Sequence, residues 1–283
     1  GWYVDIYKRA QISINFNNYK VSSIHDVFDA ACELAEKRGV RVTGSELVGL
    51  VPEDALLMAG NHYLKKQGRS LGVPKEDIIE TALQSLGLND VVPFNPSKKI
   101  IEYSINNDGK KLSSLPMTEF IDELSRNSVA PGGGSASALV GSLGASLLSM
   151  VASLNHEKKD YINIKNEMGD IGLEAQSLKN RLTSLVDEDT NAFNQLIKMN
   201  RLPDSTPSES KYKKESIKKA NEYAIEVPYE VASLCFRILE IAKNLVGKGN
   251  PNSISDIEVA SEAALCGLRG AAMNVLINLK GID

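Results

Sequence analysis

Cysteine, histidine and tryptophan are scarce in this 283-residue sequence, which has three cysteines, three histidines and one tryptophan. The cysteines, Cys32, Cys235 and Cys266, are odd in number and far apart, so the sequence predicts neither a disulfide framework nor a CxxC metal site. The histidines have no partner at the spacing of metal ligands, so we expect no metal and an exposed position for each: His25, His62 and His156.

A basic surface and a targeting segment are also missing. The formal net charge of -4 and the lack of an arginine patch interleaved with aromatic residues argue against a nucleic-acid partner, because proteins that bind phosphate backbones need a basic surface. No charged segment followed by an apolar run opens the chain, so secretion is not expected and a reducing cytoplasm is the predicted location. Since the chain starts at Gly1 and enters an apolar run directly, we expect it to be a fragment.

What the sequence does contain is typical of globular proteins. Apolar residues make up 42% and charged residues 24%, and the length fits about two domains. Residues 1–104 mix strand and helix periods, whereas residues 115–283 are almost entirely helical in pattern. The polar, turn-rich stretch between them, residues 105–114, is the expected linker.

The first domain is predicted to be an α+β layer of sheet and helices. Ile12, Ile14 and Phe16 alternate with polar residues, which predicts a strand paired with residues 2–5. A helix is expected between a serine cap at position 22 or 23 and Gly39, then a buried strand over residues 40–51 and a helix opened by Pro52. The polar face of the first strand is a candidate ligand-binding surface: Gln11, Ser13 and Asn15.

The second domain is predicted to be an all-α up-and-down bundle, with long helices over about residues 162–198, 207–242 and from 255 onward. Residues 129–156 precede them and carry no formal charge. A transmembrane helix is the competing interpretation, but six serines and two further glycines make the stretch too polar. Its leucine stripe and its small-residue stripe indicate a helix buried on both sides, with one neighbour expected from another subunit.

Gly132, Gly133, Gly134 and Ser135 stand at the start of this uncharged helix. Consecutive backbone N–H groups at a helix N-terminus can bind an anion or a carbonyl-like group. A flexible entry turn explains a glycine run equally well. We treat the four residues as candidate ligand-binding residues.

Helical projection separates two carboxylates in the segment 183–193. Asp189 falls on the apolar face with Leu185 and Phe193, whereas Asp187 falls on a polar stripe that also carries Lys198. An aspartate in an apolar face has a raised pKa, which suits a general acid or base, or it is satisfied by a neighbouring helix. Asp189 is the first catalytic candidate and Asp187 the second.

Three further polar groups are candidates for ligand binding. Asn274 shares a face with small residues of the last helix, and Asn250 and Asp256 belong to a turn and helix cap before it. A hydrogen bond within the helix core would explain the position of Asn274 as well as ligand binding does. The lysine run 211–219 is either a solvated helix face or a site that attracts a polyanionic ligand.

These motifs resemble a known family. Residues 44–52 and 93–103, with the polar strand before them, are similar to the C-terminal subdomain of glutamate formiminotransferase. Residues 130–135, 184–189 and 274–279 are similar to the formiminocyclodeaminase domain. The order matches the bifunctional formiminotransferase-cyclodeaminase family. That family's N-terminal subdomain, with its catalytic histidine, and its final helix have no counterpart in this sequence. The transferase portion is therefore expected to be incomplete, and this chain alone should show no transfer from formiminoglutamate.

The resemblance implies a folate enzyme of histidine degradation. The transferase moves a formimino group from formiminoglutamate to tetrahydrofolate, and the cyclodeaminase closes 5-formiminotetrahydrofolate to 5,10-methenyltetrahydrofolate with loss of ammonia. Tetrahydrofolate, in its polyglutamate form, would be a cosubstrate rather than a tightly bound cofactor. The bundle would pair into homodimers within a larger homo-oligomer. A methenyltetrahydrofolate cyclohydrolase and a catalytically silent folate-binding or assembly module are the alternatives.

Overall fold

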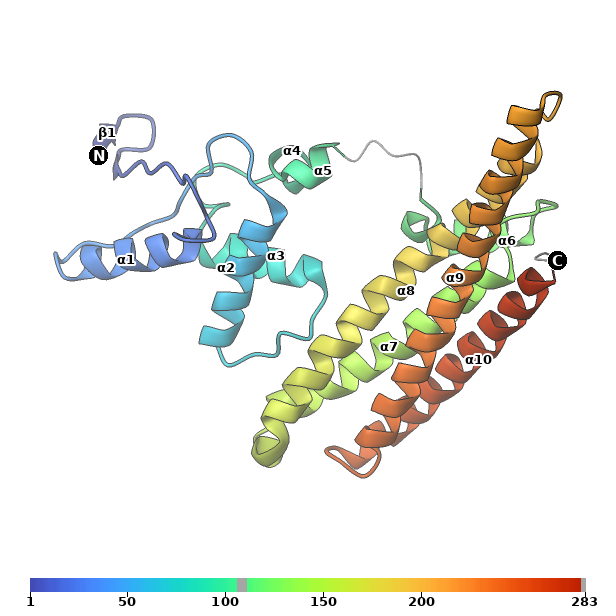
Figure 1. The fold of residues 1–283 in the computed structure, drawn as a ribbon. Coiled ribbons are helices and arrows are strands. Elements are labelled where there is room, and N and C mark those ends of the chain that lie inside the picture. Colours follow the sequence, from blue (N-terminus) through green and yellow to red (C-terminus); the bar gives the residue numbers. More distant parts are fainter. Residues whose placement is uncertain (106–110, 281–283) are drawn as a thin grey trace. The chain divides into compact units, whose positions relative to one another are not determined.

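The computed structural model describes residues 1–105 and 111–280. The chain divides into two compact units, Gly1–Asn107 and Asp108–Asp283, and each has its own hydrophobic core. Of the expected linker, residues 106–110 lie outside the described residues. The predominantly helical character predicted for the chain is confirmed (Figure 1).

The first unit contains one short hairpin and five helices in its described part. Their bounds are β1 Trp2–Val4, β2 Arg9–Gln11, α1 Ile24–Glu36, α2 Glu53–Lys66, α3 Lys75–Ser85, α4 Pro96–Lys99 and α5 Ile101–Ile105. Its core lies between α2 and α3, where Leu56, Ala59 and Leu86 are fully buried. Gly60 allows this close approach, because a Cβ at that position would overlap the Ile78 backbone.

Helix α1 follows its sequence signals. Ser23 is the N-cap and accepts a hydrogen bond from the Asp26 N–H, and Gly39 follows the helix with a φ of 72°. Both features are as predicted, because a serine oxygen satisfies a free N–H at the start of a helix and glycine tolerates positive φ after its end.

The strand predicted from the alternation of Ile12, Ile14 and Phe16 and the buried strand predicted over residues 40–51 are both wrong. Residues 2–4 pair with residues 9–11 instead. β2 ends at Gln11, and Ile12 and Ile14 in the irregular segment after it are 70% and 47% exposed. Of the stretch 40–51, only Val51 is buried, through a single bridge to Ile100. Alternating apolar residues form a strand only where a partner strand supplies hydrogen bonds and a packed layer covers one face, and the described residues supply neither here.

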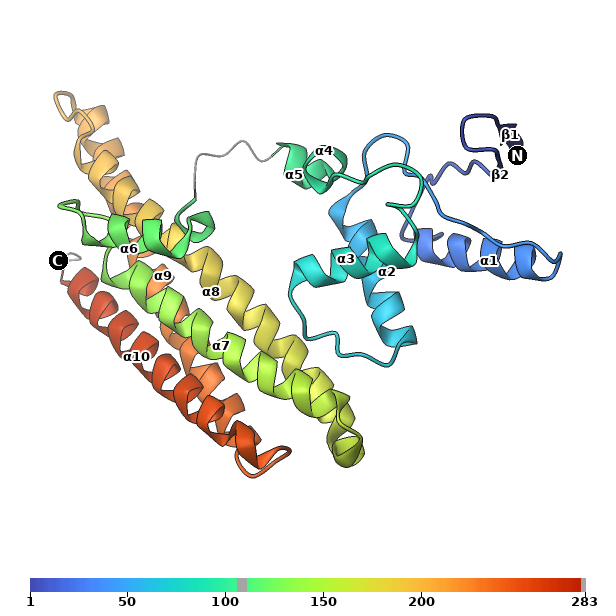
Figure 2. The ribbon, with the colours of Figure 1, turned by 180° about the vertical axis from the view of Figure 1, so that it is seen from behind.

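The second unit is a bundle of four long helices, with shorter segments at its ends. The bounds are η1 Leu112–Ser114, α6 Met117–Ser125, α7 Gly133–Glu157, η2 Lys159–Ile164, α8 Lys165–Asn200, α9 Pro207–Leu245, η3 Pro251–Ser253 and α10 Ile254–Leu279. Consecutive long helices pack side by side, and α10 packs back against α7 (Figures 1 and 2). Because α8 and α9 are longer than α7 and α10, their joined ends project beyond the other two helices.

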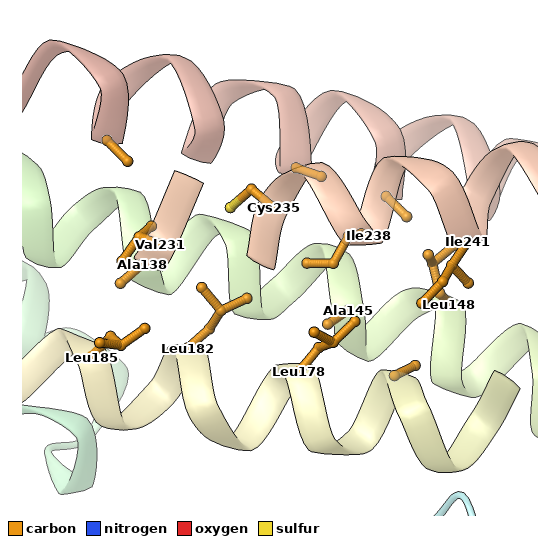
Figure 3. Packing of buried hydrophobic residues seen from close by; sticks show 14 of the residues in the cluster. Ala138, Ala145, Leu148, Leu178, Leu182, Leu185, Val231, Cys235, Ile238 and Ile241 are labelled. Atoms are coloured by element: carbon orange, nitrogen blue, oxygen red, sulfur yellow. The ribbon is translucent and has the colours of Figure 1, made fainter. Parts of the chain in front are cut away.

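Large side chains of α8 and α9 fill the bundle core against small ones of α7 (Figure 3). Leu182, Leu185 and Ile238 are fully buried, as are Ala138 and Ala145 of α7. Glycines bring α7 and α10 close together, since a Cβ on Gly144 would lie 2.8 Å from the Ala260 carbonyl oxygen. A layer of small residues lets helix backbones approach one another more closely than leucine would.

The two stripes of α7 have different environments. The small-residue stripe is buried against α8, α9 and α10, whereas Leu143, Met150 and Leu154 of the leucine stripe are 53%, 41% and 47% exposed within one chain. Within a single chain only the small-residue stripe is buried, so the predicted burial of both stripes is not observed. By length and composition α7 could cross a membrane, but just over half of its apolar stretch is buried inside the bundle.

Candidate active site

The site is built on the first turn of α7, where Gly132 is the N-cap. The first N–H to bond back into the helix is that of Ala136, which donates to the Gly132 carbonyl oxygen at 3.0 Å. The N–H groups of a first helical turn lack partners within the helix and carry partial positive charge. This turn therefore offers hydrogen-bond donors to an acceptor that lies beyond the end of the helix.

Asp189 of α8 supplies such an acceptor. Its carboxylate accepts hydrogen bonds from the backbone N–H and the hydroxyl of Ser135, with 3.0 Å between Ser135 Oγ and Asp189 Oδ2. Gly134 lies directly beneath the carboxylate, and a Cβ on Gly134 would overlap it. Glycine at this position therefore leaves the space that the Asp189 carboxylate occupies against the first turn of α7.

Burial raises the pKa of Asp189, and the two hydrogen bonds from Ser135 offset only part of that rise. Removing a carboxylate from water disfavours its charged form, whereas hydrogen-bond donors favour it. Asp189 is half-buried rather than fully buried, and its pKa is shifted in the predicted direction. A carboxyl group of raised pKa that is still partly exposed can exchange protons with a bound molecule.

Asn274 of α10 completes the site from a third helix. Its side-chain nitrogen lies 3.7 Å from the position that a Cβ on Gly133 would occupy, and it donates to the Gly270 carbonyl oxygen at 2.8 Å. The structure thus brings together Gly132, Gly133, Gly134, Ser135, Asp189 and Asn274, which the sequence predicted as separate candidates. Three helices hold them, so the arrangement depends on bundle packing.

Asp187 is engaged elsewhere. Its carboxylate accepts hydrogen bonds from the Leu112 N–H at 2.7 Å and from the Ser113 hydroxyl, and so holds the η1 turn onto α8. The next residue, Glu188, is paired with Arg181 at 2.5 Å, and Arg181 also binds Glu230. The polar stripe predicted for Asp187 therefore faces the segment before α6, which sequence projection of a single helix could not show.

Three candidates lie away from this site. Asn250 donates through its N–H to the Asn155 side chain at 2.8 Å, and Asn155 is about 33 Å along α7 from Gly133. Asp256 is about 27 Å along α10 from Asn274. Lys198 is exposed, about 14 Å beyond Asp189 on α8. Within one chain these three residues do not share a site with the glycine turn, and their role in ligand binding stays a prediction.

The apolar face projected around Asp189 also ends sooner than predicted. Ala192 is buried, but Phe193 is 38% exposed and Leu196 is half-buried. Beyond Ala192, α8 runs past the start of α7 and loses that packing partner. Asp189 thus stands near the point where the bundle core meets solvent.

The candidates in the first unit are solvent-facing. Gln11 is the half-buried last residue of β2, and Ser13 and Asn15 are exposed in the irregular segment that follows. They do not share one strand face as predicted, since the strand ends at Gln11.

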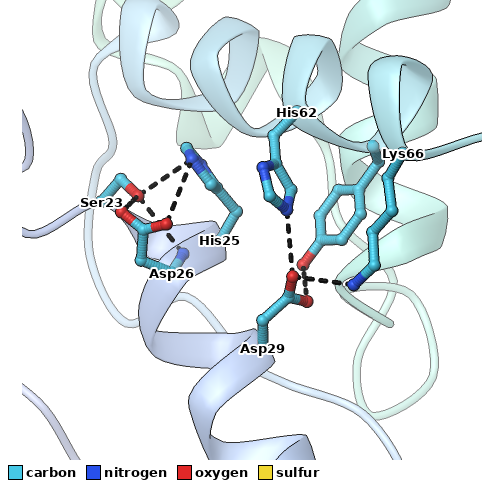
Figure 4. A network of polar contacts seen from close by, with 7 residues as sticks. Ser23, His25, Asp26, Asp29, His62 and Lys66 are labelled. Carbon is cyan, nitrogen blue, oxygen red and sulfur yellow. Dashed lines mark hydrogen bonds and ion pairs between the residues drawn. The ribbon is translucent and has the colours of Figure 1, made fainter.

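The first unit also contains a polar cluster that sequence reasoning missed (Figure 4). His25 of α1 and His62 of α2 stack with ring centroids 4.4 Å apart, and Asp29 accepts hydrogen bonds from Tyr63 at 3.1 Å and from Lys66 at 2.8 Å. The prediction of exposed, scattered histidines is wrong for this pair. The residues are far apart in sequence and meet only because α1 packs on α2, so no spacing rule could reveal them.

Comparisons with known proteins match both units. The formiminotransferase-cyclodeaminase family profile matches residues 116–283, and the formiminotransferase domain profile matches residues 1–106. A formimidoyltransferase-cyclodeaminase from Mus musculus is 35% identical over 282 residues, covering 99% of this chain and 52% of the relative. The chain thus spans about half the length of this relative and of similar ones in other animals.

Two shorter relatives match the bundle. A methenyltetrahydrofolate cyclohydrolase from Methylorubrum extorquens is 35% identical over 164 residues, covering 58% of this chain and 79% of the relative. The crystal structure of formiminotetrahydrofolate cyclodeaminase from Thermotoga maritima is similar with a TM-score of 0.54 and 27% identity, over 60% of this chain and 81% of that one. The chain belongs to the formiminotransferase-cyclodeaminase family.

Proposed function

We propose that the second unit is a cyclodeaminase that converts 5-formiminotetrahydrofolate to 5,10-methenyltetrahydrofolate and ammonia. The observation that carries this proposal is the half-buried Asp189 carboxyl group that Ser135 holds against the first turn of α7, where burial raises its pKa. The family relationship supports the substrate class, because a solved relative acts on the same folate.

The reaction needs one group that accepts and then returns a proton. The N10 nitrogen attacks the formimino carbon, a bond forms between them, and ionised Asp189 takes the N10 proton. The former imine nitrogen, protonated from solvent, then receives the Asp189 proton and leaves as ammonia when its bond to carbon breaks. The methenyl cation remains. A carboxyl group of raised pKa suits both halves of this cycle.

The glycine turn and Asn274 would hold the substrate. The Gly133 and Gly134 N–H groups belong to the first turn of α7, where free donors can bind a pterin carbonyl or stabilise developing charge. Asn274 supplies an amide beside Gly133. Tetrahydrofolate in this proposal is a substrate, with no tightly bound cofactor.

Ammonia release tests the proposal directly. The 283-residue chain, supplied with 5-formiminotetrahydrofolate, should release ammonia in step with the absorbance rise of 5,10-methenyltetrahydrofolate. Binding of the folate without either product would overturn the proposal and favour a silent folate-binding module.

A methenyltetrahydrofolate cyclohydrolase is the second candidate, because the alignment with one such enzyme includes 79% of that enzyme's length. This activity would add water to the methenyl carbon. The two are separated by supplying 5,10-methenyltetrahydrofolate alone. Hydrolysis faster than the cyclisation of the formimino compound would favour the cyclohydrolase.

The lysines of α9 would attract the polyglutamate tail of the folate. Lys211, Lys214 and Lys219 are exposed on the part of α9 that projects beyond α7. This part is at the same end of the bundle as Asp189, since Asn278 of α10 bonds to Ala224 farther along α9. Polyglutamylated substrate should bind more tightly than the monoglutamate and lose that advantage in salt. Equal affinities and salt dependence would leave these lysines as a solvated face.

The first unit would serve the same pathway. We infer that it is part of a glutamate formimidoyltransferase acting in histidine degradation in the cytoplasm, with Gln11, Ser13 and Asn15 lining a folate cleft. Transfer of a formimino group from formiminoglutamate to tetrahydrofolate, assayed on the whole protein, tests this assignment.

Pairing of bundles into a homodimer within a larger homo-oligomer would cover the exposed leucine stripe of α7.

A further inference from the structure

Ser135 is the fully buried hydroxyl of the site, with 0% of its surface exposed. Its Oγ lies 3.0 Å from Asp189 Oδ2, 3.0 Å from the Val186 carbonyl oxygen and 3.2 Å from Thr190 Oγ1. A serine hydroxyl has one hydrogen to donate and two lone pairs to accept. It can therefore donate to Asp189 or to Val186, but not to both at once.

The two acceptors correspond to the two protonation states of Asp189. When the carboxylate is ionised, the Ser135 hydroxyl can donate to Oδ2, and the Thr190 hydroxyl can donate to Ser135 Oγ. When Asp189 carries a proton, its own O–H can donate to Ser135 Oγ, and the serine hydrogen can turn to the Val186 carbonyl oxygen. No heavy atom has to move between these arrangements, and each leaves the buried hydroxyl satisfied.

We propose that Ser135 is a positioning residue whose hydroxyl turns between Asp189 and the Val186 carbonyl, so that the carboxyl group is hydrogen-bonded in both halves of its proton cycle. This inference rests on the proposed function. It also revises the sequence prediction for Ser135, since a fully buried hydroxyl with protein partners acts through Asp189 rather than by contacting substrate.

The charged groups near Asp189 are engaged with other partners, so the hydrogen bonds to its carboxyl group come from Ser135. On α8, Asp187 is bonded to residues 112 and 113, and Glu188 is paired with Arg181. Residues 129–155, which include the start of α7, carry no formal charge, and Asn274 of α10 is neutral. Burial and the bonds from Ser135 are accordingly the causes that set the pKa of Asp189.

Substitution of Ser135 gives the test. Ser135→Ala should raise the pKa of Asp189, because a donor to the ionised form is lost, and should lower kcat roughly tenfold, the effect of one hydrogen bond. The acid limb of the pH profile should move to higher pH with the pKa, because Asp189 must be ionised to accept the N10 proton. Ser135→Thr keeps the hydroxyl and should keep the profile. The matched control is Ser142→Ala, a buried serine of α7 that donates to Leu139.

Carbon NMR of labelled aspartate measures the Asp189 pKa without any turnover. An unchanged pKa and pH profile in Ser135→Ala, beside an inactive Asp189→Asn, would overturn the role of Ser135 and leave the proposed function standing. Near-normal ammonia release by Asp189→Asn would overturn the catalytic role of Asp189 in the proposed function, while the NMR titration of the unsubstituted chain and of Ser135→Ala would still report on the hydroxyl.

Neutron diffraction tests the same inference in the unsubstituted chain, should Ser135→Ala fail to fold. Crystals above and below the Asp189 pKa should show the Ser135 deuterium directed at Asp189 and at Val186, respectively. A deuterium directed at Val186 in both would overturn the inference.

Discussion

At the scale of single residues, the site depends on a buried carboxylate and on the glycine beneath it. Burial raises the pKa of Asp189, so the folded chain holds its proton more tightly than the unfolded chain does. The free energy of unfolding from this group therefore falls as pH rises from the ordinary aspartate range through the raised pKa. Ionisation of Asp189 therefore lowers the free energy of unfolding.

Asp189→Asn should consequently keep or increase the free energy of unfolding at pH 7, because the amide keeps its size and an acceptor oxygen without the buried charge. In thermal unfolding measured across the acid range, the variant should also lack the part of the pH dependence that comes from Asp189. A loss of about 1 to 3 kcal/mol at pH 7 would instead mark Asp189 as a structural carboxylate.

Gly134→Ala should push the carboxylate away from the α7 turn, since the new methyl group overlaps it. We expect a loss of about 1 to 3 kcal/mol in stability and about a hundredfold in ammonia release. Gly132→Ala is the matched control, because nothing lies within 4 Å of a Cβ there. Equal activity in the two variants would show that the contact at Gly134 does not position Asp189.

At the scale of elements, periodicity predicted the helices well and the strands poorly. A helix satisfies its own backbone, so Ser23, Gly39 and the glycine turn before α7 were sufficient local signals. A strand depends on a partner and a covering layer, which no local pattern reports. The bond between Ser135 and Asp189 and the stack of His25 on His62 arise from packing between helices, beyond the reach of single-helix projection.

Docking of α1 on α2 should depend on pH. Burial and the neighbouring His62 lower the pKa of His25, although Asp26 and Asp29 act in the opposite direction. The folded chain thus binds the His25 proton less tightly than the unfolded chain, so stability is lost as pH falls below the ordinary value of 6.5.

The protection of the α1 amides against hydrogen exchange, corrected for the intrinsic effect of pH on exchange rates, should accordingly be lower at pH 5 than at pH 7.5. His25→Gln should reduce this difference, whereas substitution of the part-buried His156 in the second unit should leave it unchanged. The same protection of α1 at both pH values would show that the histidine pair does not control its docking.

At the scale of the whole molecule, the leucine stripe of α7 is an apolar face that stays exposed to solvent in a single chain. Leu143, Met150 and Leu154 lie on one outward face, and a second copy would cover them in the proposed dimer. Leu143→Arg should shift the chain from dimer to monomer in sedimentation, because a charge in an apolar interface is unfavourable. Tyr212→Arg, at an exposed aromatic on the projecting part of α9, should not. A monomeric unsubstituted chain would contradict the pairing.

The central claim is that Asp189 transfers the proton during ring closure, and ammonia release by Asp189→Asn and Asp187→Asn tests it most directly. Asp189→Asn should slow release by about 10² to 10⁴ while the chain stays folded, as expected for loss of a general acid and base. Asp187→Asn should be milder, since that carboxylate holds the η1 turn. Near-normal release by Asp189→Asn would contradict the account, and an inactive, folded Asp187→Asn beside it would assign the proton transfer to Asp187.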